Sequence, residues 1–306
     1  MRDFIQTIID EIGQVLLGKE EQIKLALACV LSDGHLLIED LPGMGKTTLA
    51  HALAKTLGLS YQRVQFTSDM LPADIIGVSV YERDPGRFVF HPGPVFTQLL
   101  LADEINRTTP KTQSALLEAM EERQVTIEGE TRKLDDPFFV IATQNPLSQM
   151  GTFPLPESQL DRFLMRISLG YPSPDAERRL FLGGDPRAQL ARLKARLSPE
   201  KLPAIKRAAK QVKTSDSLID YLQRLVQHTR HSPEFACGLS PRGALALLRV
   251  AKTWAFMHNR NYVIPEDLQA LVPSVIGHRV TSATSGSEGH AQTLVAELLN
   301  AVDVIA

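Results

Sequence analysis

The stretch that decides the fold is Asp40-Leu-Pro-Gly-Met-Gly-Lys-Thr, residues 40–47. It directly follows the apolar run His35–Glu39, which we expect to be a strand, and it precedes a helical pattern. Glycines at this spacing let backbone N–H groups wrap a β-phosphate, and the start of the next helix adds its positive end. Lys46 then supplies a cation to the β- and γ-phosphates, and Thr47 supplies a hydroxyl for Mg²⁺. The segment therefore predicts a loop that binds a nucleotide such as ATP.

This loop departs from the usual pattern at Asp40, which stands where the first glycine is expected. That position is farthest from the phosphates, so we expect nucleotide binding to survive. The alternative is a tight strand-to-helix turn with an exposed lysine, which explains the Gly-Lys-Thr-Thr run less well. The nucleotide contacts expected here are Asp40, Leu41, Pro42, Gly43, Met44, Gly45, Lys46, Thr47 and Thr48.

A second signal is Leu99-Leu-Leu-Ala-Asp-Glu-Ile, residues 99–105. An apolar strand that ends in Asp103 brings a carboxylate to the carboxyl edge of the sheet, where open α/β folds bind ligands. Asp103 can hold Mg²⁺ through water, and Glu104 can act as general base for an attacking water. Alternatively, both carboxylates only begin the next helix, where they would favour its positive end.

Apolar runs that alternate with helical patterns predict an α/β domain over residues 1–172. The expected strands are His35–Glu39, Tyr61–Phe66, Gln98–Ala102, Phe138–Thr143 and Phe163–Leu169, with helices near 4–16 and 20–32. Strands spaced by helices imply a parallel sheet covered on both faces. Residues 175–275 show helical patterns and no strand, 281–289 resemble a linker, and 291–305 a last helix. We therefore expect an all-helical domain over residues 173–306.

Three further residues have both a catalytic and a structural interpretation. Asn145 ends a predicted strand and can orient the lytic water, or it is a turn residue before Pro146. Arg162 precedes the last strand and is either an arginine finger or part of a surface salt bridge. Arg242 in Ser240-Pro-Arg can contact a γ-phosphate from the helical domain, or the segment is a plain helix cap with proline in the first turn.

Composition narrows the class of protein further. The 306 residues carry 33 Lys and Arg against 35 Asp and Glu, a net charge of −2, so the basic character of many nucleic-acid-binding domains is missing. The longest apolar run, Leu25–Leu31, falls far short of the ~20 residues that span a bilayer. Asp10 and Glu11 interrupt any signal-peptide core, and two cysteines make no disulfide framework. We expect a soluble, cytoplasmic protein without a membrane span.

The order of motifs closely resembles the MoxR family of AAA+ ATPases, from about residue 10 to residue 275. The matching segments are Leu17-Gly-Lys-Glu, the loop at 40–47, Leu101-Ala-Asp-Glu-Ile-Asn-Arg, Pro110-Lys-Thr-Gln-Ser-Ala-Leu-Leu-Glu-Ala-Met-Glu-Glu, Ala142-Thr-Gln-Asn-Pro, Leu160-Asp-Arg-Phe and Leu239-Ser-Pro-Arg. The resemblance implies a P-loop AAA+ core with a parallel five-stranded sheet and a helical lid. It also implies two β-hairpin insertions, for which Ile76–Pro92 and Gln124–Asp136 alternate as hairpins should.

Residue roles follow from the same resemblance. Lys46 and Thr47 resemble the phosphate and Mg²⁺ contacts, and Asp103 and Glu104 resemble the Walker B pair. Asn145 resembles the first sensor, and Arg242 the second. Arg162 is similar to the finger that reaches a neighbouring subunit's nucleotide, with Arg166 as the alternative, and Leu17 and Gly18 resemble the loop that packs the adenine. Such proteins are similar to chaperones that mature protein complexes, usually as hexameric rings and often with von Willebrand factor A-domain partners.

Two other functions compete with a protein-remodelling ATPase. A nucleic-acid-associated AAA+ motor would use basic hairpins, because it must grip phosphates. The charges of Glu82, Arg83, Asp84 and Arg87 cancel in the first hairpin, and residues 124–136 carry a net charge of −2. A small-molecule kinase or GTPase switch is disfavoured because no Asn-Lys-x-Asp guanine signature occurs.

Overall fold

The computed structural model describes residues 3–84, 86–145, 151–183, 186–283 and 289–305. Its centre is a five-stranded parallel sheet with the strand order β2-β5-β8-β1-β9. The strands are β1 (His35–Glu39), β2 (Tyr61–Gln65), β5 (Leu99–Asp103), β8 (Phe139–Gln144) and β9 (Phe163–Ile167). All five predicted strands are confirmed, and their ends differ from the expected bounds by no more than two residues. The predicted α/β fold with a parallel five-stranded sheet is confirmed.

Helices on both faces complete the layers that a parallel sheet requires. The first are α1 (Asp3–Val15), α2 (Glu20–Leu31) and α3 (Lys46–Leu57). Ile5, Ile8 and Ile12 recur at helical spacing on α1 and are buried in the main core against α2 and α3. Helix α5 (Pro110–Glu122) packs on the second face of the sheet, where its Leu116, Leu117 and Met120 are buried.

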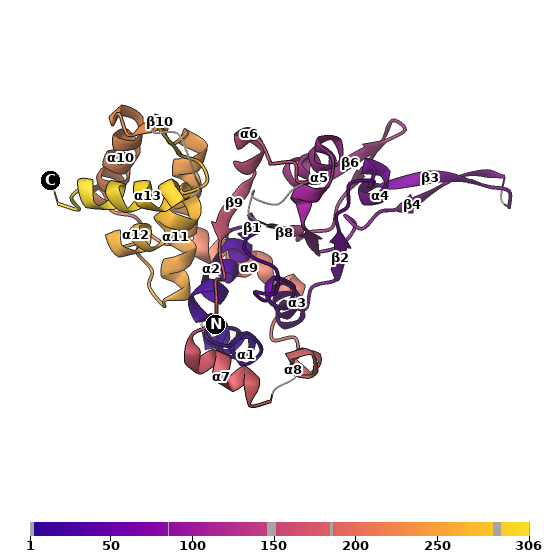
Figure 1. The fold of residues 1–306 in the computed structure, drawn as a ribbon, viewed down its shortest axis with the longest axis horizontal. Coiled ribbons are helices and arrows are strands. Elements are labelled where there is room, and N and C mark those ends of the chain that lie inside the picture. The colour runs from indigo at the N-terminus through magenta and orange to yellow at the C-terminus, as the bar shows by residue number, and fades with distance from the viewer. Residues whose placement is uncertain (1–2, 85, 146–150, 184–185, 284–288, 306) are drawn as a thin grey trace.

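Both expected β-hairpins are present. The first pairs β3 (Gly77–Glu82) with β4 (Arg87–Pro92) after the short helix α4 (Pro72–Ile76), and it projects far from the sheet (Figure 1). The second pairs β6 (Gln124–Ile127) with β7 (Glu130–Lys133). Its turn residues Glu128 and Gly129 both have positive φ, at 53° and 80°, as a two-residue hairpin turn demands. Pro85, in the predicted turn of the first hairpin, lies outside the described residues.

The rest of the chain is mainly helical, and α10 to α13 gather beside β9 in Figure 1. The helices after β8 are α6 (Glu157–Leu160), α7 (Pro174–Phe181), α8 (Pro186–Arg192), α9 (Leu202–Lys210), α10 (Asp216–His231), α11 (Pro241–Met257), α12 (Pro265–Ile276) and α13 (Gly289–Ala301). Helix α11 packs on α2 and α9, while α8 packs on α1 and α3. The segment just after residue 173 is therefore in contact with the α/β layers. The division at residue 172 stays a prediction.

One expectation about this region is wrong. A small antiparallel pair joins β10 (Phe235–Cys237) to β11 (Thr281–Ser282), although no strand was expected in 175–275 and a linker was expected from 281. The strands are too short for an alternating pattern, and the pairing is long-range, so only the tertiary structure reveals it. Residues 284–288 of the expected linker lie outside the described residues. None of the described helices has the length and apolar character that a membrane crossing needs.

Candidate functional site

The phosphate loop joins the carboxyl end of β1 to the first turn of α3. Gly43 and Gly45 have φ of 86° and 93°, which glycine adopts without strain. A Cβ on Gly45 would also lie 2.6 Å from Cδ1 of Leu16. Helix α3 has no side-chain cap, so its first N–H groups face the loop. Of the remaining predicted contacts, Leu41 and Pro42 are exposed, whereas Met44, Thr47 and Thr48 are half-buried.

Asp40 fixes the base of this loop to the segment that follows β9. Its Oδ2 accepts hydrogen bonds from the backbone N–H groups of Leu169 and Gly170, both at 2.6 Å. The Nζ of Lys19 strengthens the same junction by donating to the carbonyl oxygens of Leu169, at 2.6 Å, and Tyr171, at 2.5 Å. Burial lowers the pKa of Lys19, and the charge of Asp40 opposes that change. The residue that departs from the glycine pattern therefore holds the loop through its carboxylate.

Lys46 points into the space between the loop and β8. Its Nζ donates to the carbonyl oxygen of Asp40 at 2.6 Å and to Oδ1 of Asn145 at 3.2 Å. Burial lowers the pKa of Lys46, while the negative charges of Asp40, Asp103 and Glu104 act in the opposite direction. The alternative of a plain turn with an exposed lysine does not match this buried side chain.

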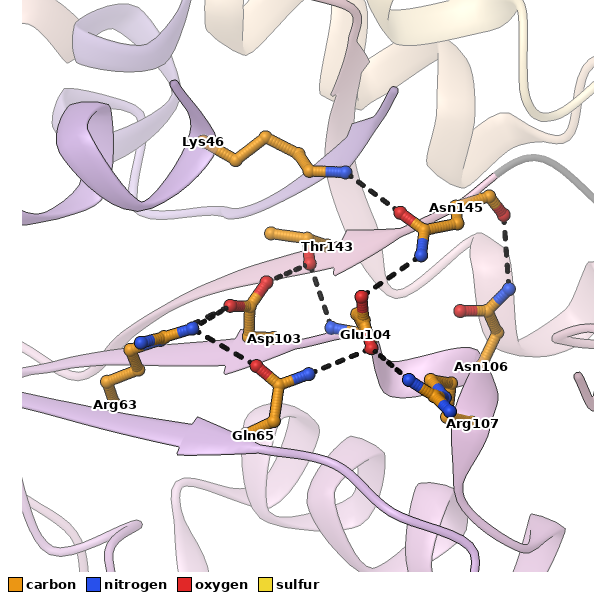
Figure 2. A network of polar contacts seen from close by, with 9 residues as sticks. All are labelled: Lys46, Arg63, Gln65, Asp103, Glu104, Asn106, Arg107, Thr143 and Asn145. Carbon is orange, nitrogen blue, oxygen red and sulfur yellow. Dashed lines mark hydrogen bonds and ion pairs between the residues drawn. The ribbon is translucent and has the colours of Figure 1, made fainter. Parts of the chain in front are cut away.

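Asp103, the last residue of β5, is buried and doubly held (Figure 2). Its Oδ1 accepts a hydrogen bond from the Thr143 hydroxyl at 2.6 Å, and its Oδ2 pairs with Nη2 of Arg63 at 2.7 Å. Carboxylate and hydroxyl oxygens are the ligands Mg²⁺ prefers, and the ion usually keeps several waters. Asp103 together with Thr47 at the start of α3 fits that donor set.

Glu104 stands in the left-handed region, with φ of 57° and ψ of 50°, and its side chain enters a polar network (Figure 2). Its Oε1 accepts from Nδ2 of Asn145 at 3.1 Å. Its Oε2 accepts from Nε2 of Gln65 at 2.9 Å and from Arg107 at 3.0 Å. A short 3₁₀ turn, Ile105–Arg107, follows, and α5 starts only at Pro110, so neither carboxylate caps that helix. Asn145 bridges Lys46 and Glu104, which is the position a water-orienting amide would need.

Three residues of this network, Arg63, Gln65 and Thr143, were not predicted from the sequence. Arg63 and Gln65 belong to β2, whose register sets Gln65 beside Asp103. The available signal was the polar pattern Tyr61-Gln-Arg-Val-Gln, unusual for a strand of a parallel sheet. This polar pattern identifies site residues only when the pairing of β2 with β5 is known.

Arg162 and Arg242 lie together but away from Lys46. Arg162 directly precedes β9, and β9 runs parallel to β1, so Arg162 is at the amino edge of the sheet. The phosphate loop follows the carboxyl end of β1, at the opposite edge. A five-residue strand spans about 16 Å at ~3.3 Å per residue, so the two groups are a strand length apart.

The structural interpretations of both arginines hold within one chain: Arg162 forms an ion pair, and Arg242 follows a helix cap at Ser240. Nε of Arg162 lies 2.9 Å from Oε2 of Glu121, and Nη1 of Arg242 lies 3.2 Å from Oε1 of the same carboxylate. Ser240 caps α11 by accepting from the N–H of Gly243 at 3.1 Å. The alternative finger, Arg166, instead pairs with Glu39 at 3.0 Å and donates to the carbonyl oxygen of Gly277.

A cavity of about 540 Å³ opens beside the two arginines at the amino edge. Its lining includes the arginines Arg123, Arg162, Arg242, Arg249 and Arg279 and the carboxylates Asp33, Glu121 and Asp161. The excess of guanidinium groups gives the cavity a positive character that suits an anion.

The residues expected to pack an adenine lie at the end of α1. Leu17 lines a hollow of about 250 Å³ together with Arg179, Leu180 and Leu182 of the α7 region. Gly18 has φ of 70°, and a Cβ there would lie 2.9 Å from Cβ of Ala176 in α7. The junction between α1 and α7 is therefore close-packed beside a partly apolar hollow.

Comparisons with known proteins agree with this geometry. Residues 35–165 match a family model described as "ATPase family associated with various cellular activities (AAA)", and residues 227–298 match one described as an AAA lid domain. The chain is 45% identical over 298 residues to the uncharacterized protein YeaC of Bacillus subtilis, covering 97% of this chain and 93% of that protein. It is 39% identical over 287 residues to Chaperone MoxR1 of Mycobacterium tuberculosis, covering 90% and 75%. The solved structure of a candidate ATPase from Cytophaga hutchinsonii has a TM-score of 0.87 at 38% identity, covering 100% of this chain and 96% of that one.

Proposed function

Because the chain belongs to the MoxR family of AAA+ ATPases, we propose that it hydrolyses ATP in a hexameric ring and remodels protein clients. The observation that carries this proposal is the separation of the charged groups within one chain. Lys46, Asp103, Glu104 and Asn145 gather at the carboxyl edge of the sheet, whereas Arg162 and Arg242 share the amino edge. In a head-to-tail ring, the amino-edge arginines of one subunit reach the nucleotide of the next.

Each group of the carboxyl edge then has a defined task. Lys46 and the loop N–H groups bind the β- and γ-phosphates, and Leu17 and Gly18 contact the adenine. Thr47 and Asp103 would hold Mg²⁺, which when bound neutralises charge on the phosphates. Glu104, oriented by Gln65 and Asn145, accepts the proton of the attacking water.

The amino edge supplies the remaining charge. Arg162 acts in trans as the finger on the neighbour's γ-phosphate, and Arg242 contacts the same phosphates as second sensor. The cavity with its excess of arginines supports this arrangement, because a triphosphate is strongly anionic. The name Chaperone MoxR1 of the Mycobacterium tuberculosis relative supports a protein client. We propose a cytoplasmic ATPase of this kind, with von Willebrand factor A-domain proteins among its partners and no nucleic acid as substrate.

Lys46→Ala is expected to weaken ATP binding by about 2–5 kcal/mol, or about 30- to several-thousand-fold, because a buried phosphate loses its cation. Isothermal titration calorimetry measures the Kd. Lys55→Ala is the matched control, since Lys55 lies on the same helix and donates to carbonyl oxygens near residue 190. Parent-like affinity in Lys46→Ala would show that the loop does not bind the phosphates.

Ring formation should respond to nucleotide, because each complete site needs two subunits. With ATP or a non-hydrolysable analogue at micromolar protein, mass photometry is expected to show hexamers, and fewer of them without nucleotide. A protein that stays monomeric with nucleotide present would contradict the ring.

A further inference from the structure

Glu121 lies between the two arginines of the amino edge. Its Oε2 is 2.9 Å from Nε of Arg162, and its Oε1 is 3.2 Å from Nη1 of Arg242. One oxygen therefore serves each guanidinium, although Arg162 comes from the α/β layers and Arg242 from the start of α11. Asp161 lies farther from Arg242, with 3.7 Å between its Oδ2 and Nε of Arg242. Its Oδ1 pairs with Arg279 at 2.7 Å. Glu121 is the carboxylate that joins the two arginines.

Three contacts hold the residues on either side of Glu121, Met120 and Arg123. Burial lowers the pKa of His35 to about 4, so its ring is neutral at pH 7. Its Nδ1 accepts from the N–H of Val140 at 3.0 Å, so its Nε2–H donates to the carbonyl oxygen of Met120 at 3.1 Å. Arg123, the residue that follows α5, has φ of 53° and pairs with Asp33 at 2.9 Å. The N–H of Leu134 donates to the Arg123 carbonyl oxygen at 3.0 Å. The backbone that carries the Glu121 side chain is therefore fixed on both sides.

Helix α5 also connects the two edges of the sheet. It starts a few residues after Glu104, and its 13 residues, at about 1.5 Å each, cover about 20 Å before it ends beside the arginines. Near its start the Gln113 amide is buried and donates to the carbonyl oxygens of Ile105, at 3.2 Å, and Thr108, at 3.3 Å. The segment after Glu104 is therefore tied to the helix that carries Glu121.

We propose that Glu121 is a positioning residue that holds Arg162 and Arg242 as one unit for the neighbouring subunit's ATP. This inference rests on the proposed function. The carboxylate fixes the two guanidinium groups while its charge leaves a net positive pair facing the incoming phosphates.

The direct test is Glu121→Gln, which keeps the shape but replaces one acceptor oxygen by an NH2 group, and an NH2 group cannot accept a hydrogen bond from a guanidinium. We expect kcat to fall by about 10- to 100-fold, the cost of a misplaced group, with KM for ATP within about twofold of the parent. Glu122→Gln, the same change one residue later, is the matched control and should keep parental kcat. Unchanged or increased kcat in Glu121→Gln would overturn the proposal; an increase would identify Glu121 as a competitor of the phosphates.

Two further measurements separate positioning from a general structural role. In an Arg162→Ala/Arg242→Ala background, adding Glu121→Gln should lower kcat by less than about threefold, because both arginines through which Glu121 acts are already removed. Mixing Glu121→Gln with Glu104→Gln should restore turnover, because the first keeps its own Glu104 and the second offers intact arginines. The proposal would be overturned if Glu121→Gln still lowered kcat by the full 10- to 100-fold in that background. It would also be overturned if mixed rings showed no restored turnover.

Glu121→Asp keeps the charge on a shorter side chain and carries the test if the Gln variant does not fold in a thermal melt. Its kcat should lie between the parent and Glu121→Gln, and the Glu104→Gln partner should restore it. The proposed function fails separately: if Arg162→Ala and Glu104→Gln do not complement each other, the trans site itself is wrong. If they do, and Glu121→Gln behaves as the parent, only the role of Glu121 is refuted.

Discussion

Arg162→Ala is expected to lower kcat for ATP hydrolysis by about 10³- to 10⁵-fold, the usual contribution of an arginine finger. ATP affinity should stay within about twofold of the parent, because Arg162 lies at the sheet edge opposite the chain's own phosphate loop. Steady-state phosphate release gives kcat, and calorimetry gives the Kd.

Two variants define what this loss means. Arg162→Lys keeps a charge but not the planar fork, so it should recover only part of the rate. Arg166→Ala breaks the pairs with Glu39 and Gly277 instead and should have a much smaller effect on kcat. If Arg166→Ala showed the large loss and Arg162→Ala did not, Arg166 would be the finger and Arg162 a partner in a surface ion pair.

Glu104→Gln is expected to lower kcat by about 10²- to 10⁴-fold while ATP still binds, because the amide cannot accept the proton of the attacking water. The substitution is isosteric, and its remaining carbonyl oxygen can still accept a hydrogen bond from Gln65 or Asn145. Single-turnover hydrolysis and calorimetry measure the two effects separately. Retained turnover would move the general base elsewhere, and weak binding would indicate that Glu104 supports the loop instead.

The parts predicted well from sequence depend on local patterns. The phosphate loop needs glycines at φ values that few other residues tolerate, and the buried strand β5 is a continuous apolar run from Leu99 to Ala102. A few consecutive residues are therefore enough to predict each of them. The hairpin at 124–133 follows from alternation around Glu128-Gly129. These predictions agree with the structure because the tertiary contacts favour the same conformations as the local sequence does.

The parts that were missed depend on pairing between distant segments. Arg63 meets Asp103 only because β2 lies beside β5, and the strands β10 and β11 find each other across more than forty residues. The contact of Glu121 with Arg162 and Arg242 joins three separate segments. The edge of the sheet at which Arg162 lies was predictable, because a residue that precedes a parallel strand lies at the strand's amino end. Its ion-pair partner, Glu121, was not predictable.

The most direct test of a site shared between subunits is ATP turnover in mixtures of Arg162→Ala and Glu104→Gln, each nearly inactive alone. In a ring, an Arg162→Ala subunit that receives Arg162 from a Glu104→Gln neighbour has one complete site. Random mixing at equal amounts makes about a quarter of the sites complete in a head-to-tail ring. We expect the mixture to turn over ATP well above the rate of either variant alone. No restoration, with mixed rings confirmed by native mass spectrometry, would contradict a site shared between subunits.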